Sequence, residues 1–392
     1  MTHPALANGP IYLDYNATTP VDPAVHEAAL PYLTHHFGNP SSAHHYASEP
    51  RQALARARRQ VADLLAATPE EIIFTAGGSE ADTLAIRGAA LAAPTPRRQL
   101  ITLATEHPAV LQACRSLQAD GFTTTMLPID QYGRLDPADL EKAIGPGTAL
   151  VSIAYGNSET GTLQPIAELA AIARRHGALF HTDAAQAAGK LPIDVAGQGV
   201  DLLTVVGHKM YAPKGIGALY LRSGVHLQPI IHGGGQEAGL RSGTENIAFI
   251  VALGHAAELA RQELPGSAVR LAALRDLLQR ELERLLGERV QLNGHPTQRL
   301  PGTLNVSIAG VNARKLLAAI PQIAAATGSA CHEGLDAPSP VLLAMGMSAD
   351  RATAALRLSL GRWTSEPQVR RAADLIAGQV TPARGDGALS GA

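Results

Sequence analysis

Short apolar runs alternate with helical patterns along the chain from about residue 50 to residue 260. Several runs are apolar almost throughout, which is typical of strands that are covered on both faces of a sheet. Stretches with apolar residues at helical spacing, such as 53–67 and 166–177, lie between the runs. This alternation predicts an α/β fold with a large, mostly parallel sheet of seven strands. The expected strands are 71–76, 99–105, 123–129, 149–155, 178–183, 202–207 and 217–222.

The pattern changes around Pro265 and Gly266. Beyond them, leucines repeat at helical spacing, and Gly287 is expected to end that helix. These leucines are Leu271, Leu274, Leu278, Leu282 and Leu285. The runs 302–310 and 355–362 predict two further strands, accompanied by two more helical patterns.

The length of 392 residues suits one large domain and one smaller domain. We expect a large α/β domain at residues 15–260. Residues 1–14 and 261–392 are expected to form a smaller α+β domain. A hydrophobic fraction of 46% is ample for a buried core in both.

The formal net charge of −2 gives no reason to expect nucleic acid or an anionic membrane as a partner. No apolar run approaches the length needed to cross a bilayer, and residues 1–10 lack the features of a signal peptide. The only two cysteines, Cys114 and Cys331, provide no disulfide framework. We therefore expect a cytoplasmic protein.

Lysine is rare in this chain, since only five of its 32 basic residues are lysines. They are Lys142, Lys190, Lys209, Lys214 and Lys315. Genomic base composition explains the ratio but does not explain which lysines remain. Lysine can lose its proton near neutral pH and bond covalently to an aldehyde, whereas arginine can do neither. A lysine beside a glycine-rich loop is therefore a candidate catalytic residue.

The carboxyl ends of the expected strands are where an open α/β sheet binds its ligands. After the first run, Gly77 and Gly78 allow a tight turn, and Ser79 opens a helical pattern. A helix start of this kind suits a phosphate group, because its free N–H groups and its dipole attract anions. The alternative is that Ser79 only caps the helix, with Asp82 completing a capping box.

Two other strand ends carry ionisable side chains. Asp183 ends the fifth run, and a buried carboxylate there needs a cationic partner such as the protonated ring nitrogen of a cofactor. Capping of a following helix is the alternative for Asp183. Gln186 follows three residues later, and His208 and Lys209 follow the sixth run. A phosphate-binding turn, a strand-end aspartate and a strand-end lysine are together the set that pyridoxal phosphate requires.

Eight motifs resemble those of the cysteine desulfurases, a group within the class-V aminotransferase-fold family. They are "YLDYNATTP", "FGNPSSAHH", "FTAGGSEAD", "EHPAV", "HTDAAQAAGKLPID", "GHKMYAPKGIGALY", "GGGQEAGLRSGTEN" and "GSAC". They occur in the family's order from about residue 11 to residue 375. The resemblance implies a pyridoxal-phosphate-dependent transferase fold of the aspartate aminotransferase type, fold type I. It also implies a homodimer that takes sulfur from L-cysteine and releases L-alanine.

The resemblance also implies how pyridoxal 5'-phosphate is held. Lys209 would bind it covalently, Asp183 would pair with its ring nitrogen, and His107 would stack on the ring and assist proton transfers. Gln186 and Asn157 would bond the ring hydroxyl.

The phosphate group would be held by Gly78, Ser79 and His208. Thr244 of a second subunit would reach across to the same group.

The substrate site implied by the resemblance contains Arg357, which would bind the carboxylate of L-cysteine as a bidentate fork, together with Asn16. Cys331 would take the sulfur as a persulfide and pass it to an acceptor protein, such as an iron–sulfur scaffold, or to a thiolation relay. Cys114 lies among apolar residues at helical spacing, and we expect it to be a packing residue.

Two departures from the family pattern affect what is expected. Val206 stands where many members have a serine, and Ser158 stands where the second asparagine of the "NNE" motif is usual. The stretches "VVGHK" and "CHEGLDAPSPVLL" also resemble selenocysteine lyases, so release of selenium from L-selenocysteine is the first alternative. An ordinary transaminase and a catalytically silent scaffold are the others. The histidines His35, His36, His44 and His45 match no zinc signature, and no metal is expected.

Overall fold

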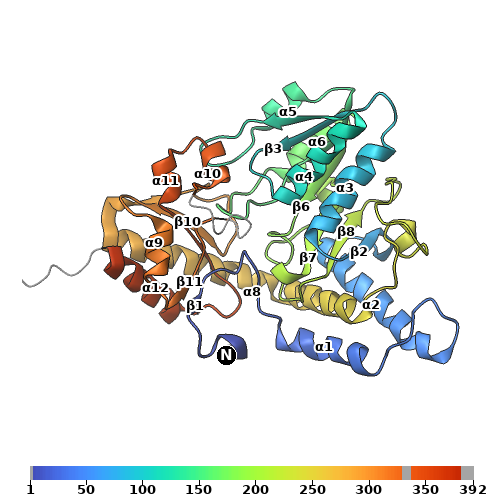
Figure 1. The fold of residues 1–392 in the computed structure, drawn as a ribbon, viewed down its shortest axis with the longest axis horizontal. Coiled ribbons are helices and arrows are strands. Elements are labelled where there is room, and N and C mark those ends of the chain that lie inside the picture. The colour runs from blue at the N-terminus through green and yellow to red at the C-terminus, as the bar shows by residue number, and fades with distance from the viewer. Residues whose placement is uncertain (1–2, 329–336, 381–392) are drawn as a thin grey trace, which may run out of the picture.

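The computed structural model describes residues 3–328 and 337–380 of the chain. Its main sheet has seven strands in the order β2-β8-β7-β6-β5-β3-β4 (Figure 1). Neighbours from β7 to β4 pair in parallel, whereas β8 runs antiparallel to both β7 and β2. The strands are β2 (Ile72–Thr75), β3 (Gln99–Leu103), β4 (Thr123–Leu127), β5 (Thr148–Ser152), β6 (Leu179–Asp183), β7 (Leu202–Val206) and β8 (Gly217–Leu221). The prediction of seven strands in a mostly parallel sheet is confirmed.

Helices cover both faces of this sheet, as the nearly continuous apolar strands predicted. β2, β5 and β7 are buried at every position. Successive strand residues point to opposite faces, so Ile72 packs in one cluster of buried side chains and Ile73 packs in another. The helices of the chain are α1 (Pro23–Thr34), α2 (Ser48–Leu65), α3 (Gly78–Ala92), α4 (Pro108–Ser116), α5 (Pro137–Ala143), α6 (Ile166–Arg175), α7 (Val195–Gln198), α8 (Ile247–Leu286), α9 (Ala313–Ala318), α10 (Pro340–Ala344), α11 (Ala349–Thr353) and α12 (Glu366–Val380).

A second core forms around a three-stranded antiparallel sheet of order β12-β10-β9. Its strands are β9 (Val290–Leu292), β10 (Thr303–Ile308) and β12 (Ala355–Ser359). Two short strands, β1 (Ile11–Tyr12) and β11 (Ile323–Ala324), pair in parallel beside it. The two strands expected from the runs 302–310 and 355–362 are therefore present.

Helix α8 belongs to both cores. It runs without interruption through Pro265 and Gly266, so the change of pattern there does not end a helix. Its buried residues up to Ala260 pack in the core of the large sheet, and those from Leu271 pack in the second core. Gly287, with a φ of +60°, follows the last residue and ends the helix as predicted. The proposed domain boundary at residue 260 thus lies within one continuous helix.

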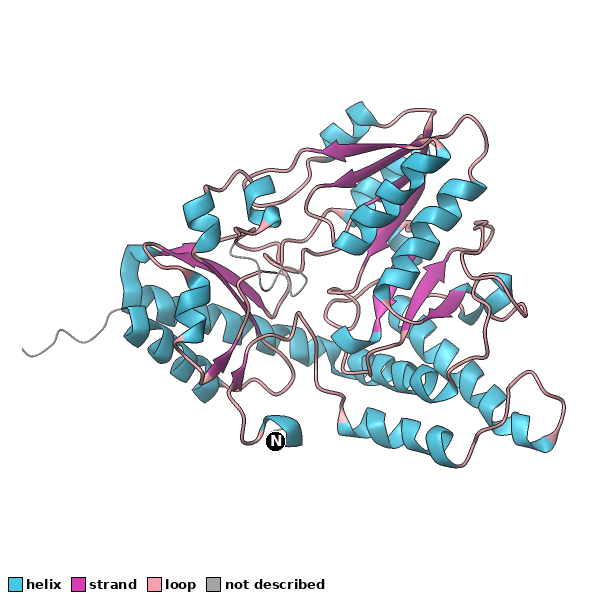
Figure 2. Cartoon of the chain, in the orientation of Figure 1, coloured by secondary structure: helices cyan, strands magenta, loops and turns pink. Residues whose placement is uncertain are grey.

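The carboxyl ends of the parallel strands lie at one edge of the large sheet, and that edge faces the smaller sheet. Figure 2 shows the loops from these strand ends gathered between the two sheets. The segment after β1 also reaches this region, because Asp14 forms a bridge with Ser359 of β12. Any site built at these strand ends therefore receives side chains from both cores.

Candidate active site

A cavity of about 300 Å³ lies at this junction, within the size range of small-molecule sites. Its lining includes ten of the twelve candidate residues predicted from the sequence, whereas Thr244 does not line it and Cys331 lies outside the described residues. The ten are Asn16, Gly78, Ser79, His107, Asn157, Asp183, Gln186, His208, Lys209 and Arg357.

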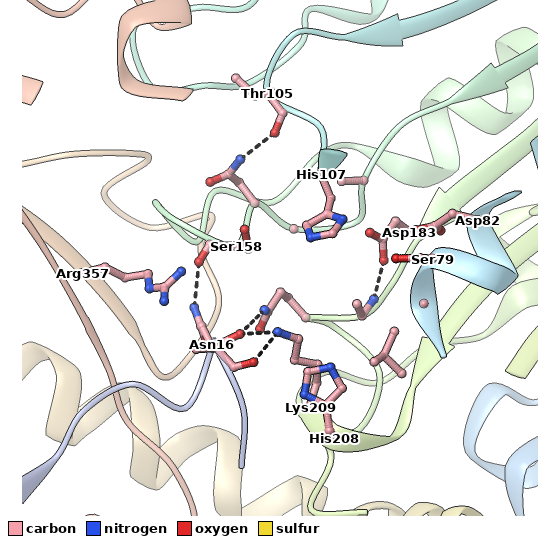
Figure 3. Close-up of a pocket in the computed structure, with 18 residues that line it drawn as sticks. Asn16, Ser79, Asp82, Thr105, His107, Ser158, Asp183, His208, Lys209 and Arg357 are labelled. Carbon is pink, nitrogen blue, oxygen red and sulfur yellow. Dashed lines mark hydrogen bonds between the residues drawn. The ribbon is translucent and has the colours of Figure 1, made fainter. Parts of the chain in front are cut away.

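Lys209 ends a short 3₁₀ turn, Gly207–Lys209, that directly follows β7. Its Nζ donates hydrogen bonds to the backbone oxygens of Asn16 and Ala17, both at 2.7 Å. In Figure 3, the Lys209 side chain extends from the strand end toward these carbonyls and into the space that Asp183 also faces. The amine is therefore held at the floor of the cavity by contacts that a covalent bond could replace.

Asp183 ends β6 and accepts a hydrogen bond from the Ala185 N–H at 2.8 Å. Burial raises the pKa of Asp183, against the lowering effects of that hydrogen bond and of the charges of His107 and Lys209. No helix begins at Asp183, since the next one, α7, is capped by Asp194, so the helix-cap alternative is wrong. A buried carboxyl of this kind suits a protonated nitrogen of a ligand.

The start of α3 forms another side of the cavity. Gly77 caps the helix with a φ of +148°, and Ser79 lies within the first turn, so the proposed Ser79 cap is wrong. Asp82 does not complete a capping box either, because its carboxyl is buried and its Oδ1 has no hydrogen-bond partner in the described part of the chain. A Cβ on Gly78 would lie 2.7 Å from Val206 Cγ2, so the helix start can approach β7 only with glycine there.

Two histidines face the cavity from different elements. His107 caps α4, and its Nδ1 accepts the Ala109 N–H at 3.2 Å, which fixes the ring at the end of the helix. His208 Nδ1 lies 3.1 Å from Thr18 Oγ1. Burial, followed by the charges of Lys209 and Lys214, lowers the pKa of His208 to about 4. His208 is therefore neutral at pH 7 and can contribute a hydrogen bond rather than a charge.

Asn157 is largely occupied by its own turn. Its Oδ1 accepts hydrogen bonds from the N–H groups of Glu159 and Thr160, both at 2.9 Å, and its Nδ2 donates to the Thr105 carbonyl at 3.1 Å. Since an amide nitrogen carries two protons, one N–H remains for a ligand.

Gln186 is tied to a lysine that the sequence analysis did not assign to the site. Lys190 Nζ donates to Gln186 Oε1 at 2.7 Å, and Gln186 Nε2 donates to the Asn16 carbonyl at 2.9 Å. A signal was present in the sequence, because Lys190 is one of the five lysines and follows Gly189.

Arg357 enters the cavity from β12 in the second core and is 1% exposed. Its Nη2 donates to Asp14 Oδ1 at 2.7 Å, while its buried Nε has no hydrogen-bond partner among the described residues. Asn16 lies nearby, with its Nδ2 donating to the Ser158 carbonyl and to Thr303 Oγ1. Asp14 was not predicted as a site residue, since its contact joins positions far apart in the sequence.

The structure describes one of the two cysteines, Cys114. Cys114 is buried in α4, and burial raises the pKa of its thiol to about 12, as expected for a packing residue. Cys331 lies outside the described residues. The residues on either side of that segment are described, and Gly328 and Ser339 both lie against Glu159, one residue from Ser158 of the cavity lining.

Thr244 is exposed on the loop before α8 and does not line the cavity of its own chain. In the part of the chain that is described, no helix is long and apolar enough to cross a membrane. Within residues 3–328 and 337–380, no group of three or more His, Cys, Asp or Glu side chains could hold a metal ion.

Glu106, which lies between Thr105 and His107 of the cavity lining, makes the stability of the protein depend on pH. It is buried, its Oε1 accepts the Ala154 N–H at 2.9 Å, and burial raises its pKa to about 8. Because the folded state keeps a proton that the unfolded state releases near pH 4.5, stability falls as pH rises from about 5 to about 8. Glu106→Gln should remove this dependence, which amounts to about 1.4 kcal/mol per pH unit at most.

Urea unfolding at pH 6 and pH 8 measures the effect. We expect the free energy of unfolding of the Gln variant to exceed that of the wild type by more at pH 8 than at pH 6. Equal pH dependence in the two proteins would contradict the assignment of a raised Glu106 pKa.

Comparison with known proteins adds independent information. The aminotransferase class-V family model matches residues 11–371. A protein of Anaeromyxobacter dehalogenans (strain 2CP-C) named cysteine desulfurase IscS is 46% identical over 378 residues, which cover 96% of this chain and 93% of that protein. A Mus musculus protein named cysteine desulfurase is 45% identical over 363 residues, which cover 92% of this chain and 79% of that protein.

Solved structures agree with these relatives. A structure described as a NifS-like protein superposes with a TM-score of 0.88 at 34% identity, covering 95% of this chain and 99% of that chain. A structure described as SspA in complex with cysteine superposes with a TM-score of 0.79 at 38% identity, covering 90% of this chain and 99% of that chain.

Proposed function

Because this chain belongs to the aminotransferase class-V family, we propose that it is a cysteine desulfurase, a sulfurtransferase that takes sulfur from L-cysteine and releases L-alanine. The observation that carries the proposal is the convergence of Lys209, Asp183 and Arg357 on one cavity, from two strand ends and the second core. The names of the relatives support the same activity, and one similar solved structure holds cysteine.

The residues of the cavity fit pyridoxal phosphate. The buried Asp183 carboxyl would pair with the ring nitrogen, and Lys209 Nζ would bond covalently to the cofactor aldehyde. The start of α3 at Gly78 and Ser79, together with His208, would hold the phosphate group. When bound, the cofactor supplies an electron sink for the carbon atoms of an amino acid substrate.

The protein's own groups would then bind and orient the substrate. Arg357 would bind the carboxylate of L-cysteine, because its guanidinium is fixed by Asp14 and its buried Nε has no partner within residues 3–328 and 337–380. Lys209 Nζ, at the floor of the cavity, is placed to take and return the Cα proton. His107 would contact the ring face and assist proton transfer at the leaving sulfur.

We assign the sulfur-accepting thiol to Cys331. The only other cysteine, Cys114, is buried with a raised thiol pKa, so it is not an available nucleophile. The Cys331 thiolate would attack the substrate sulfur, forming an S–S bond as the carbon–sulfur bond breaks. The electron pair of the broken bond stays with the carbon skeleton, which leaves as alanine after protonation. The persulfide on Cys331 would pass its sulfur to an acceptor protein, such as an iron–sulfur scaffold.

A homodimer is part of this proposal. Thr244 is exposed in its own chain, so a contact with the phosphate group requires the cavity of a second copy. We place the reaction in the cytoplasm, where thiols remain reduced.

The direct test is release of alanine by the purified protein supplied with pyridoxal phosphate and L-cysteine. We expect saturable alanine release, whereas no alanine with cysteine would contradict the proposal. L-selenocysteine as a second substrate separates the two sister activities, since alanine release from selenocysteine alone would favour a lyase.

In the same assay, Arg357→Lys should raise the KM for L-cysteine about 10- to 100-fold, because lysine cannot form the bidentate contact with a carboxylate. The Lys side chain keeps a positive charge beside Asp14, which limits the disturbance of the buried pair. Arg370→Lys, an exposed site on α12, is the matched control and should leave the KM unchanged. An unchanged KM in Arg357→Lys would rule out Arg357 as the carboxylate-binding residue.

A further inference from the structure

Lys190 lies behind the cavity, at the end of the turn that follows β6. Its Nζ donates to Gln186 Oε1 at 2.7 Å and lies 3.4 Å from Asn16 Oδ1. The ammonium group therefore holds the amide oxygens of two side chains that line the cavity. Neither of these contacts belongs to a regular helix or strand, so neither is required by the secondary structure.

The other end of Gln186 leads to the reactive lysine. Gln186 Nε2 donates to the Asn16 carbonyl at 2.9 Å, and Lys209 Nζ donates to the same carbonyl at 2.7 Å. Lys190, Gln186, Asn16 and Lys209 thus form one continuous hydrogen-bonded network. A change at Lys190 reaches Lys209 through the Gln186 side chain and the backbone carbonyl of Asn16.

Lys190 fixes the direction of the Gln186 amide at its oxygen, and the Asn16 carbonyl favours the same direction at its nitrogen. An amide oxygen only accepts hydrogen bonds and an amide nitrogen only donates them, whereas an ammonium group only donates. The Gln186 oxygen must therefore face Lys190, and its NH₂ group must face the opposite way. With the amide rotated by half a turn, two donors would meet and the short contact to Lys190 would be lost.

The surroundings of Lys190 disfavour the charged form of its side chain. Burial, followed by the positive charges of Lys209 and Arg357, lowers the pKa of Lys190 to about 7. On its other side is a second cavity of about 480 Å³, whose ionisable lining residues besides Lys190 are Tyr15, Tyr211, Glu263, Arg270 and Arg362. Glu263 is the only carboxylate among them, and it pairs with Arg362. Lys190 is therefore mainly a cation below pH 7, and in that form it contributes an interaction that a neutral residue would not.

We propose that Lys190 is a positioning residue for the cofactor: its ammonium group orients the Gln186 amide so that the NH₂ group serves as the donor toward the bound ring and the Lys209 end of the network. The inference rests on the proposed function, since it assumes that pyridoxal phosphate occupies the cavity. Lys190 itself need not touch the cofactor or the substrate.

The test is the binding of pyridoxal phosphate to Lys190→Met, followed by its visible absorption at increasing pH. Loss of one charge-assisted hydrogen bond predicts about tenfold weaker binding. Between pH 6 and pH 7, where Lys190 still carries much of its charge, the Met variant should keep more of the protonated form of the visible band than the wild type, because removing a neighbouring positive charge makes a protonated nitrogen at Lys209 less costly. Lys315→Met, on the exposed side of α9, is the matched control and should change neither quantity.

A double-variant cycle separates positioning from a general structural effect. If Lys190 acts through Gln186, then Lys190→Met combined with Gln186→Leu should bind pyridoxal phosphate about as weakly as Gln186→Leu alone. The inference would be overturned if the affinity losses of the two single variants multiplied in the double variant. It would also be overturned if a folded Lys190→Met protein bound pyridoxal phosphate as the wild type does and showed an unchanged band. Lys190→Gln, which keeps a donor, serves if the Met variant does not fold, and it should bind more tightly than Lys190→Ala. The reverse order would also overturn it.

Failure of the proposed function would look different. In that case, the wild-type protein itself would bind no pyridoxal phosphate and show no visible band. A wild type that binds the cofactor, with a Lys190→Met variant that behaves identically, contradicts only the role of Lys190.

Discussion

Lys209→Ala is expected to remove the visible absorption band of the protein with pyridoxal phosphate and to reduce alanine release by about 10³-fold or more, the range of a lost acid–base group. The physical reason is the position of Nζ, which two backbone carbonyls hold at the floor of the cavity. No other lysine is among the described residues that line the cavity, since Lys190 is held on the far side of Gln186. Absorption spectroscopy and an alanine assay measure the two effects.

Lys142→Ala is the appropriate control, because Lys142 is an exposed lysine on α5 that pairs with Asp139. It should retain both the band and the activity. If Lys209→Ala kept the band, another amine would have to hold the cofactor, and the assignment of Lys209 would be wrong.

Cys331→Ala is expected to abolish the addition of sulfur to the protein while preserving the visible band. The cofactor contacts proposed within this subunit come from strand ends and from the starts of α3 and α4, and none of them requires a thiol. Mass spectrometry after incubation with L-cysteine should show one added sulfur on the wild-type peptide that contains Cys331, and none on the variant.

Cys114→Ala provides the matched control for the thiol. Cys114 is buried in α4 among apolar side chains, so its loss should reduce stability modestly and leave sulfur uptake intact. Sulfur found on Cys114, or a Cys331→Ala protein that still acquires sulfur, would refute the proposed acceptor.

The large sheet could be predicted because its strands are short, apolar and buried on both faces. Because β6 and β7 run in parallel, the polar residues at or just after their carboxyl ends, Asp183 and Lys209, lie at the same edge of the sheet. The continuity of α8 could not be predicted, because Pro265 and Gly266 are locally unfavourable in a helix and only the packing of two cores overrides that preference.

Contacts between segments that are far apart in the sequence could not be predicted either, because local sequence patterns carry no information about them. The pair of Asp14 and Arg357 joins two ends of the chain, and neither neighbourhood indicates the other. Val206 stands where many family members have a serine, and the structure shows that its side chain lies against Gly78 at the start of α3. The stretch around Val206 also resembles selenocysteine lyases. The relatives that match most of this chain, however, are named cysteine desulfurases.

Helix α8 couples the folding of the two cores, because it contributes side chains to both. Its first half completes the interior of the large sheet and its second half completes that of the small one. If one core unfolded, the part of α8 that packs in it would expose its apolar side chains to water, while the other core would still require the rest of the helix. The protein should therefore lose its structure as one cooperative unit, and a fragment cut at residue 260 would carry a truncated helix rather than an independent module.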